Sequence, residues 1–161
     1  MKSSDYHSKD SMKPIRLYLD NCCFNRPFDD QSQLLVQLET EAKLFIQEEI
    51  KKGTFELVWS YILDEENSSN PSPDKKEQIS SWKPLAISDV EASSEVIRLA
   101  KEFAKQGLKS MDALHVACAI DASAEYFITV DGGILKRKIK EIWTMNPLEF
   151  LLIYKEFNKN E

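Results

Sequence analysis

The sequence contains little cysteine, little glycine and no long hydrophobic run. Its three cysteines are Cys22, Cys23 and Cys118, an odd number with two of them adjacent and no CxxC spacing. This pattern excludes a zinc-finger framework and provides no disulfide framework. With only 4 glycines and 6 prolines, the composition also argues against a fibrous or disordered chain. No stretch approaches the roughly 20 apolar residues of a membrane span.

Basic residues are outnumbered as well, since 21 lysines and arginines face 27 acids and the formal net charge is −6. Generic phosphate binding depends on lysine and arginine, so this balance does not by itself favour a nucleic-acid partner. A nucleic-acid substrate would need a local basic patch or bound cations. The N-terminus, MKSSDYHSKDSMKP, lacks the apolar stretch of a signal peptide. We therefore expect a cytoplasmic protein.

The 161 residues, 42% of them hydrophobic, suit one compact α/β domain. We expect a flexible N-terminal tail at 1–13 and a single domain at 14–157. Short apolar runs predict strands at 15–20, 55–60, 83–88, 126–131 and 141–145. Helical patterns lie between them, and we interpret 22–30 and 67–83 as loops. This alternation favours a parallel sheet with helices on both faces.

The helix predicted over 31–52 carries one apolar stripe, which only Glu49 interrupts. Gly53 is expected to end this helix. The stripe suits ordinary core packing and a dimer interface equally well. Its apolar members are Leu34, Leu35, Leu38, Ala42, Phe45, Ile46 and Ile50.

Acidic side chains stand where predicted strands end. Asp20 and Asp131 close two strands, Glu66 follows a third, and Asp112 begins the helix that precedes the Asp131 strand. Functional residues in open parallel sheets lie outside the carboxyl ends of the strands, so we expect these four to meet. A single strand-end aspartate is more simply a turn former or a helix cap.

Four carboxylates in one cleft repel one another unless a divalent cation neutralises them. Mg²⁺ and Mn²⁺ suit carboxylate and water ligands. A cation at this position can activate a water and stabilise the leaving oxygen of a phosphodiester. The cluster therefore predicts metal-dependent phosphodiester hydrolysis, with Mg²⁺ or Mn²⁺ as the cofactor.

Five segments, taken in order, resemble the PIN-domain family. DALHVA followed closely by FITVD is the most specific part, and Ser60 and Glu66 match the family's serine six residues before a glutamate, whereas Glu65 is one residue short. The resemblance runs from about residue 15 to residue 152. The segments are LYLDNCCFNRPFDD, WSYILDEEN, SMDALHVACAI, YFITVDGGIL and MNPLEFL.

The resemblance implies a three-layer α/β/α fold with a central parallel sheet of about five strands in a Rossmann-like plan. It also implies hydrolysis of single-stranded RNA that depends on Mg²⁺ or Mn²⁺. Many relatives are VapC-like toxins that form homodimers and are held inactive by an antitoxin, while others act in RNA processing or have lost activity. The metal ligands it implies are Asp20, Glu66, Asp112 and Asp131.

The sequence departs from the family pattern at two places. Asn21 and Cys22 follow the first aspartate, where the family often has threonine or serine. Gly132 and Gly133 follow Asp131, where the family often has another acid. A reduced ligand set predicts one tight metal site and one looser one. It also leaves open an alternative, a catalytically weak or inactive RNA- or protein-binding module.

Polar residues beside the four acids are candidates for supporting roles. Asn21, Ser60, Thr129 and His115 are candidates to orient the carboxylates or a bound water. His115 is three residues after Asp112, on the same helical face, although packing is its simpler role. Candidate RNA contacts are Arg26, Lys109, Lys136 and Arg137, although a solvated surface is the simpler interpretation of the basic run.

A nucleophilic mechanism is a third possibility. Asp20 would then be a phosphotransfer nucleophile, but that pattern requires a second aspartate two residues later, where Cys22 stands. Cys22 itself has no obvious histidine partner nearby in sequence. Both versions rank below metal-dependent hydrolysis.

Overall fold

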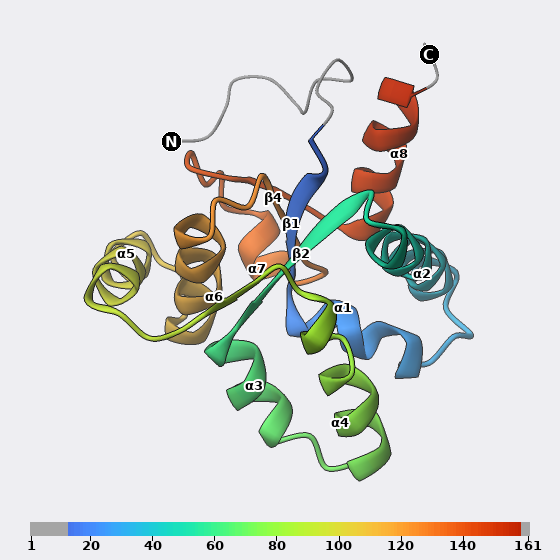
Figure 1. The fold of residues 1–161 in the computed structure, drawn as a ribbon, viewed down its shortest axis with the longest axis horizontal. Helices are drawn as coiled ribbons and strands as arrows, with labels where there is room; N and C mark the ends of the chain where they lie inside the picture. The colour runs from blue at the N-terminus through green and yellow to red at the C-terminus, as the bar shows by residue number, and fades with distance from the viewer. Residues whose placement is uncertain (1–12, 159–161) are drawn as a thin grey trace.

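The computed structural model describes residues 13–158, which alternate between short strands and helices (Figure 1). The strands are β1 (Ile15–Leu19), β2 (Phe55–Ser60), β3 (Ser88–Val90), β4 (Tyr126–Ile128) and β5 (Trp143–Met145). The helices are α1 (Asn21–Asn25), α2 (Leu34–Lys52), α3 (Tyr61–Ser68), α4 (Pro73–Ser80), α5 (Ser94–Lys105), α6 (Ser110–Asp121), α7 (Gly132–Leu135) and α8 (Pro147–Asn158). Short 3₁₀ turns occupy Arg26–Phe28 and Lys83–Leu85.

All strand pairs in the sheet are parallel, and the strand order is β3-β2-β1-β4-β5. The order reverses at β1, because the chain moves outward through β2 and β3 on one side and through β4 and β5 on the other. In sheets of this kind the ligand crevice lies outside the carboxyl ends of the strands at the reversal point. A ligand site is therefore expected among the residues that follow β1, β2 and β4.

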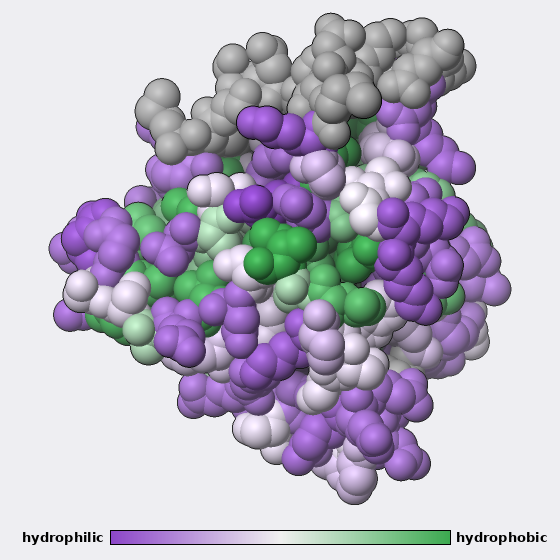
Figure 2. All heavy atoms as spheres, viewed as in Figure 1, coloured by the Kyte–Doolittle hydropathy of each residue, from purple (hydrophilic) through white to green (hydrophobic). Residues whose placement is uncertain are grey.

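Helices cover both faces of the sheet. In Figure 1, α2 and α8 lie on one side of the central strands, and α5 and α6 lie on the other. Aromatic contacts fix the first layer, since the ring of Phe55 on β2 packs against Phe150 and Tyr154 of α8. The result is the three-layer α/β/α arrangement that the sequence predicts. Figure 2 shows the same view covered mainly by hydrophilic side chains, with a hydrophobic area near its middle.

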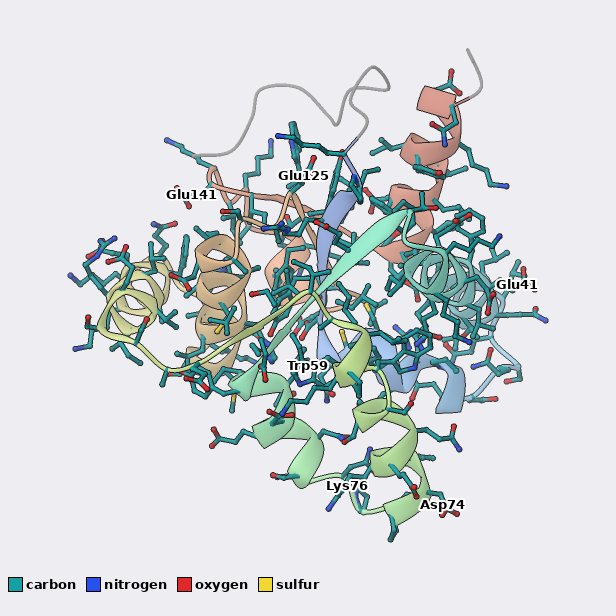
Figure 3. The ribbon with its side chains drawn as sticks, in the orientation of Figure 1. Glu41, Trp59, Asp74, Lys76, Glu125 and Glu141 are labelled. Atoms are coloured by element: carbon teal, nitrogen blue, oxygen red, sulfur yellow. The ribbon has the colours of Figure 1, made fainter. Side chains whose placement is uncertain are left out.

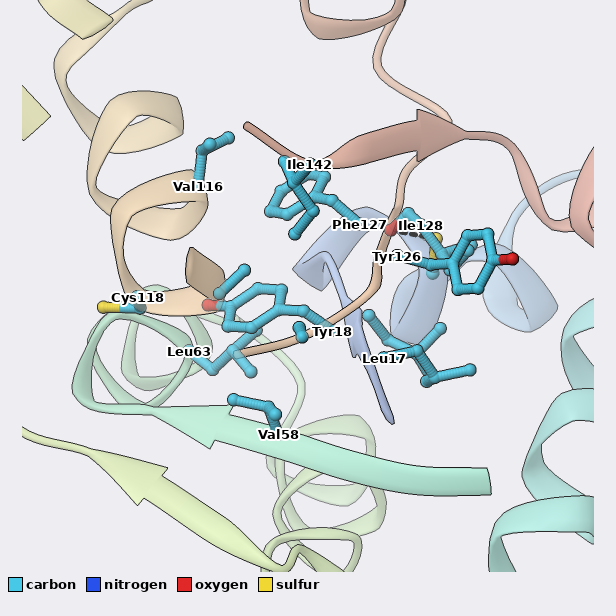
Figure 4. Close-up of a cluster of buried hydrophobic side chains, with 14 of the residues drawn as sticks. Leu17, Tyr18, Val58, Leu63, Val116, Cys118, Tyr126, Phe127, Ile128 and Ile142 are labelled. Carbon is cyan, nitrogen blue, oxygen red and sulfur yellow. Dashed lines mark hydrogen bonds between the residues drawn. The ribbon is translucent and has the colours of Figure 1, made fainter. Parts of the chain in front are cut away.

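The central strands are buried on both faces, which explains their nearly continuous apolar sequences. Leu17, Tyr18 and Leu19 of β1 are fully buried, as is Phe127 of β4. The rings of Tyr18 and Phe127 stack with their centroids 5.3 Å apart. In Figure 4 the hydroxyl end of Tyr18 is directed toward Leu63 and Cys118. A polar atom thus enters the core from the middle strand.

The predicted third strand was misplaced. Residues 83–85 form a 3₁₀ turn, and β3 begins at Ser88. Pro84 has no amide hydrogen to donate to a ladder, so pairing with β2 starts only where the Ile87 amide donates to Leu57. Because Ser88 is in the strand, it cannot cap the following helix. Ser93 does so by accepting a hydrogen bond from the Val96 amide.

Two predicted loops contain helices. The segment 22–30 holds most of α1 and a 3₁₀ turn, and α4 occupies 73–80 inside the other segment interpreted as a loop. Capping explains both helices, because Asp20 accepts from the Asn21 amide and Ser72 accepts from the Lys75 amide. The predicted tail lies almost wholly outside the described residues.

The buried face of α2 differs from the predicted stripe. Leu34, Leu35 and Leu38 are exposed, Leu34 to 68%. The residues turned inward include Val36, Ala42, Ile46 and Ile50, but also Glu39, Thr40, Lys43 and Gln47. The helix therefore packs a mixed polar and apolar face against the body of the protein. No helix among residues 13–158 has the length and apolar character needed to span a bilayer.

Lys43 places a charged side chain on this buried face. It is 4% exposed, and burial lowers its pKa to about 8, from 10.5 for an exposed lysine. Below pH 8 the lysine is charged in both the folded and unfolded states, so the folded state bears the full desolvation cost. Between about pH 8 and 10.5 only the unfolded state holds the proton, so this cost fades as the pH rises.

We expect Lys43→Met to raise the free energy of unfolding at pH 7 by roughly 1–3 kcal/mol. This advantage over the unsubstituted protein should shrink as the pH rises from 8 toward 10. Urea denaturation of both proteins across this range measures the difference. A difference that is constant with pH would show that burial does not disfavour the lysine charge.

Candidate functional site

Asp20 lies at the carboxyl end of β1 and is held from two sides. Its Oδ1 accepts a hydrogen bond of 2.8 Å from the Asn21 amide, which makes Asp20 the cap of α1. Its Oδ2 accepts one of 2.7 Å from the hydroxyl of Thr129, which follows β4. Asp20 is only 5% exposed. It makes these two hydrogen bonds at the point where the strand order reverses. Such support fixes the carboxylate before any ligand arrives.

Glu66 and His115 reach the same position from α3 and α6. His115 Nε2 is hydrogen-bonded to Glu66 Oε1 and lies 3.7 Å from Asp20 Oδ1. The side-chain amide of Asn21 donates to Glu66 Oε2 at 3.4 Å. One potential ligand atom from each of Asp20, Glu66 and His115 falls within 4.8 Å of the others. Residues far apart in the sequence therefore form one compact cluster.

A buried hydrogen-bond chain leads from this cluster into the core. The Tyr18 hydroxyl lies 2.5 Å from His115 Nδ1 and 2.6 Å from Ser60 Oγ. Ser60 Oγ also accepts from the Leu63 amide. In the tautomer that donates from Nε2 to Glu66, the imidazole accepts from Tyr18 at Nδ1, and Ser60 then donates to Tyr18. Burial raises the pKa of Tyr18 well above its usual value, which keeps this proton in place.

Asp112 and Asp131 complete the acidic edge. Burial, followed by the charges of Asp131, Asp20 and Glu66, raises the pKa of Asp112 to about 6. His115 acts in the opposite direction. Asp131 Oδ1 accepts from the Gly133 amide at 2.7 Å, and its own amide donates to Thr129 Oγ1 at 3.0 Å. The charges of the other three predicted acids thus act on Asp112.

The donor atoms fit a hard divalent cation. Carboxylate oxygens dominate the cluster, and their mutual repulsion is what a cation relieves. Asn21 Oδ1 is buried beside them and has no hydrogen-bond partner among the described residues. An unsatisfied amide oxygen next to crowded carboxylates is the environment that Mg²⁺ or Mn²⁺ favours.

The predicted basic residues lie in different surroundings. Arg26 pairs with Asp29 at 3.0 Å and with Glu39 at 3.3 Å. Arg137 donates to the backbone oxygen of Gln106 at 3.1 Å. Both guanidinium groups therefore already serve the fold. Lys109 and Lys136 are exposed at the start of α6 and the end of α7.

Sequence reasoning missed Tyr18 at this site, and it weighed Cys22 only as a nucleophile. Tyr18 precedes Asp20 by two positions, so strand periodicity places both on one face of β1, and that signal could have identified it. Cys22 has Sγ 3.4 Å from both Asp20 Oδ2 and Thr129 Oγ1, and it accepts from the Val130 amide. Its contacts show a packing partner for the Asp20 carboxylate.

A cleft opens beside Glu66 with a volume of about 410 Å³. Its walls carry hydrogen-bonding groups, among them Asn21, Asn25, Asn70 and Lys75. The cleft lies over α1, α3 and the turn before α4. In Figure 3, Trp59 lies in the interior near the end of β2, whereas Asp74 projects outward from α4. The Trp59 indole donates to Asp64 at 2.9 Å and so steadies the start of α3.

Comparison with known proteins supports the fold. A solved structure of VapBC2 from Rickettsia felis, bound to a DNA fragment from their promoter, is similar over 82% of this chain and 98% of that chain. The TM-score is 0.52 and the sequence identity is 14%. The chain therefore has a PIN-like fold, as its sequence predicts. No family model matches the sequence, and no curated protein matches it.

We expect Tyr18→Phe to lower the free energy of unfolding by about 1–3 kcal/mol, because it leaves His115 Nδ1 and Ser60 buried without their shared partner. Tyr154→Phe, at a half-buried ring on α8, is the matched control and should change stability by less than about 0.5 kcal/mol. Urea denaturation measures both. Equal stability of the Tyr18 variant and the unsubstituted protein would contradict the buried hydrogen-bond chain.

Proposed function

We propose that this protein is an endoribonuclease that hydrolyses single-stranded RNA with the help of Mg²⁺ or Mn²⁺. The observation that carries the proposal is the meeting of Asp20, Glu66 and His115 at the carboxyl edge, with the buried oxygen of Asn21 beside them. When bound, a divalent cation would supply charge neutralisation and acidify a water for attack on phosphorus. Asp20, Glu66, Asp112 and Asp131 are the residues that would hold it.

The remaining residues would orient these acids. Thr129 donates to the Asp20 carboxylate and accepts from the Asp131 backbone amide, so one hydroxyl links the two segments that carry these acids. His115 donates to Glu66 and is itself fixed by Tyr18. A rigid acidic frame costs little reorganisation when phosphate arrives. His115 thus serves better as a positioning group than as a base.

The cleft beside Glu66 suits the RNA strand. Amide and hydroxyl side chains can bond to phosphate and to the 2′-hydroxyl, which distinguishes RNA from DNA. Lys75 on its wall supplies a positive charge beside the carboxylates of Asp29 and Glu66, which line the same cleft. We therefore place the RNA strand along α1 and α4. Contacts from Lys109 and Lys136 stay a prediction for segments farther along the strand.

The similarity in fold to VapBC2 supports a biological role as well. We propose that the chain is the toxin of a toxin–antitoxin pair, in which an antitoxin protein holds it inactive. A homodimer would fit the exposed leucines at the start of α2, among them Leu34 and Leu35. Co-expression with the product of a small adjoining reading frame would test the pairing.

We expect Asp112→Asn to lower Mn²⁺-dependent RNA cleavage by roughly 100-fold or more, because it removes a ligand charge from the cluster. The variant should unfold at the same temperature as the unsubstituted protein or higher, since it relieves repulsion. Asp121→Asn, at an exposed position on the same helix, is the matched control and should cleave normally. A labelled single-stranded RNA is the substrate.

Full activity of the Asp112 variant, or full activity in excess EDTA, would refute the mechanism. If the unsubstituted protein bound RNA but did not cleave any of several RNAs with Mn²⁺, the alternative of an inactive binding module would replace it. Gly133 supports that alternative, because it stands where the family often has a further acid. Its amide donates a hydrogen bond to Asp131 Oδ1.

We expect calorimetric titration with Mn²⁺ to show one tight site and a second that is at least about tenfold weaker. The reason is the reduced number of acids after Asp131. Asp20→Asn should weaken the tight site by about tenfold or more. Two equally tight sites would contradict the reduced ligand set.

A further inference from the structure

The inward face of α2 presents polar side chains at four-residue steps: Glu39, Lys43 and Gln47. They are 4%, 4% and 5% exposed. Steps of four place side chains on the same face of a helix, one above another. Buried charges and amides cost free energy unless they find partners. Three such residues in one row on a core-facing helix therefore require an explanation.

Partners account for only one of the three. Glu39 is paired with Arg26. Lys43 forms no ion pair with any acid among residues 13–158, and its amine lies 5.5 Å from the centroid of the Phe24 ring. Gln47 Nε2 is buried and has no hydrogen-bond partner among the same residues. Lys43 Nζ and Gln47 Nε2 are thus two hydrogen-bond donors, one of them cationic, that have no acceptor among these residues.

Both donors line a cavity of about 300 Å³. Its other walls are mainly apolar or aromatic and include Phe24 of α1, Ile79 of α4 and Trp82 just beyond it. The amine of Lys51 lies over the Trp82 ring, 5.3 Å from the centroid, and is paired with Glu48 at 3.5 Å. None of the four acids of the candidate metal site lines this cavity.

We propose that this cavity binds a carboxylate that carries an aromatic or aliphatic body. The carboxylate would accept hydrogen bonds from Lys43 Nζ and Gln47 Nε2, and the body would lie against Phe24, Ile79 and Trp82. A carboxylate supplies a negatively charged partner for Lys43 and a hydrogen-bond acceptor for Gln47. Apolar walls around a few polar groups are typical of small-molecule sites. A bare phosphate would leave the aromatic walls without a partner.

The stability cost of Lys43 supports this assignment. An unpaired buried lysine destabilises the folded protein, and its replacement by methionine is expected to stabilise it. A ligand that restores the ion pair would recover that cost as binding free energy. The site is independent of the proposed nuclease function, because it uses neither the acids nor the cleft beside Glu66.

The test uses the full chain with phenylacetate, indole-3-acetate and hexanoate as probes, and phenylacetamide as the uncharged analogue. Calorimetry measures affinity, and the Trp82 indole signal in two-dimensional NMR reports the site. We expect the carboxylates to bind with dissociation constants of about 1 mM or below, and the amide at least about tenfold more weakly. Lys43→Met and Gln47→Leu should each weaken binding by about tenfold, whereas Lys52→Met, at an exposed position on the same helix, should not.

A peptide that ends in phenylalanine with a free carboxyl group distinguishes the source of the carboxylate. Binding about tenfold tighter than phenylacetate identifies a protein chain end, and equal or weaker binding identifies a small molecule. Circular dichroism verifies that the variants are folded, and Lys43→Gln replaces Lys43→Met if the latter is not. No binding at about 10 mM, equal affinity for amide and carboxylate, or unchanged affinity in the Lys43 variant would overturn the proposal.

Discussion

Carboxylates that gather at the ends of neighbouring parallel strands repel one another, and this constraint governs the functional edge of the protein. The fold brings Asp20 and Glu66 together because β1 and β2 are paired and the order reverses at β1. Each acid then receives a donor: the Thr129 hydroxyl for Asp20 and the His115 imidazole for Glu66. At Asp112, burial first and then the charges of Asp131, Asp20 and Glu66 raise the pKa to about 6.

A protein retains such crowding where a ligand relieves it. The buried oxygen of Asn21 adds a neutral donor to the acidic set, and a hard cation would satisfy both at once. The PIN-like fold places the cluster where open parallel sheets bind their ligands. Under the proposed function, a chain with a net charge of −6 would meet an RNA phosphate through the cation instead of through a broad basic surface.

The sequence predicted the elements that carry strong local signals. Apolar runs that end in an acid located β1 and β4, and the αL glycine Gly53 ended α2 as expected. Short helices were missed, because α1 and α4 depend on the capping residues Asp20 and Ser72 more than on periodicity. The strand predicted at 83–88 begins only at Ser88, because Pro84 cannot donate to the ladder. Tyr18 was overlooked because it looks like an ordinary core residue of an apolar strand, and only its two-residue spacing from Asp20 indicates the site.

Helix α2 shows most clearly where sequence reasoning ends. Its leucines form a plausible stripe, yet Leu34 and Leu35 are exposed while Lys43 and Gln47 are buried. Periodicity ranks residues by hydrophobicity, so it cannot identify a face that keeps polar groups inside for a ligand. Asp20, Glu66 and Asp131 could be proposed from the sequence because each follows a strand, and Asp112 because its helix precedes the Asp131 strand. The cavity beside Lys43 depends on α1, α2 and α4 together, and only the assembled structure reveals it.

The central claim is that distant acids form one divalent-cation site at the edge where the strand order reverses. Anomalous diffraction from crystals soaked in Mn²⁺ tests it most directly. The account predicts a strong anomalous peak bound by Asp20 and Glu66, with Asn21 or Asp112 beside it. A well-ordered crystal with no peak at this edge, or with its strongest peak elsewhere on the surface, would contradict the account.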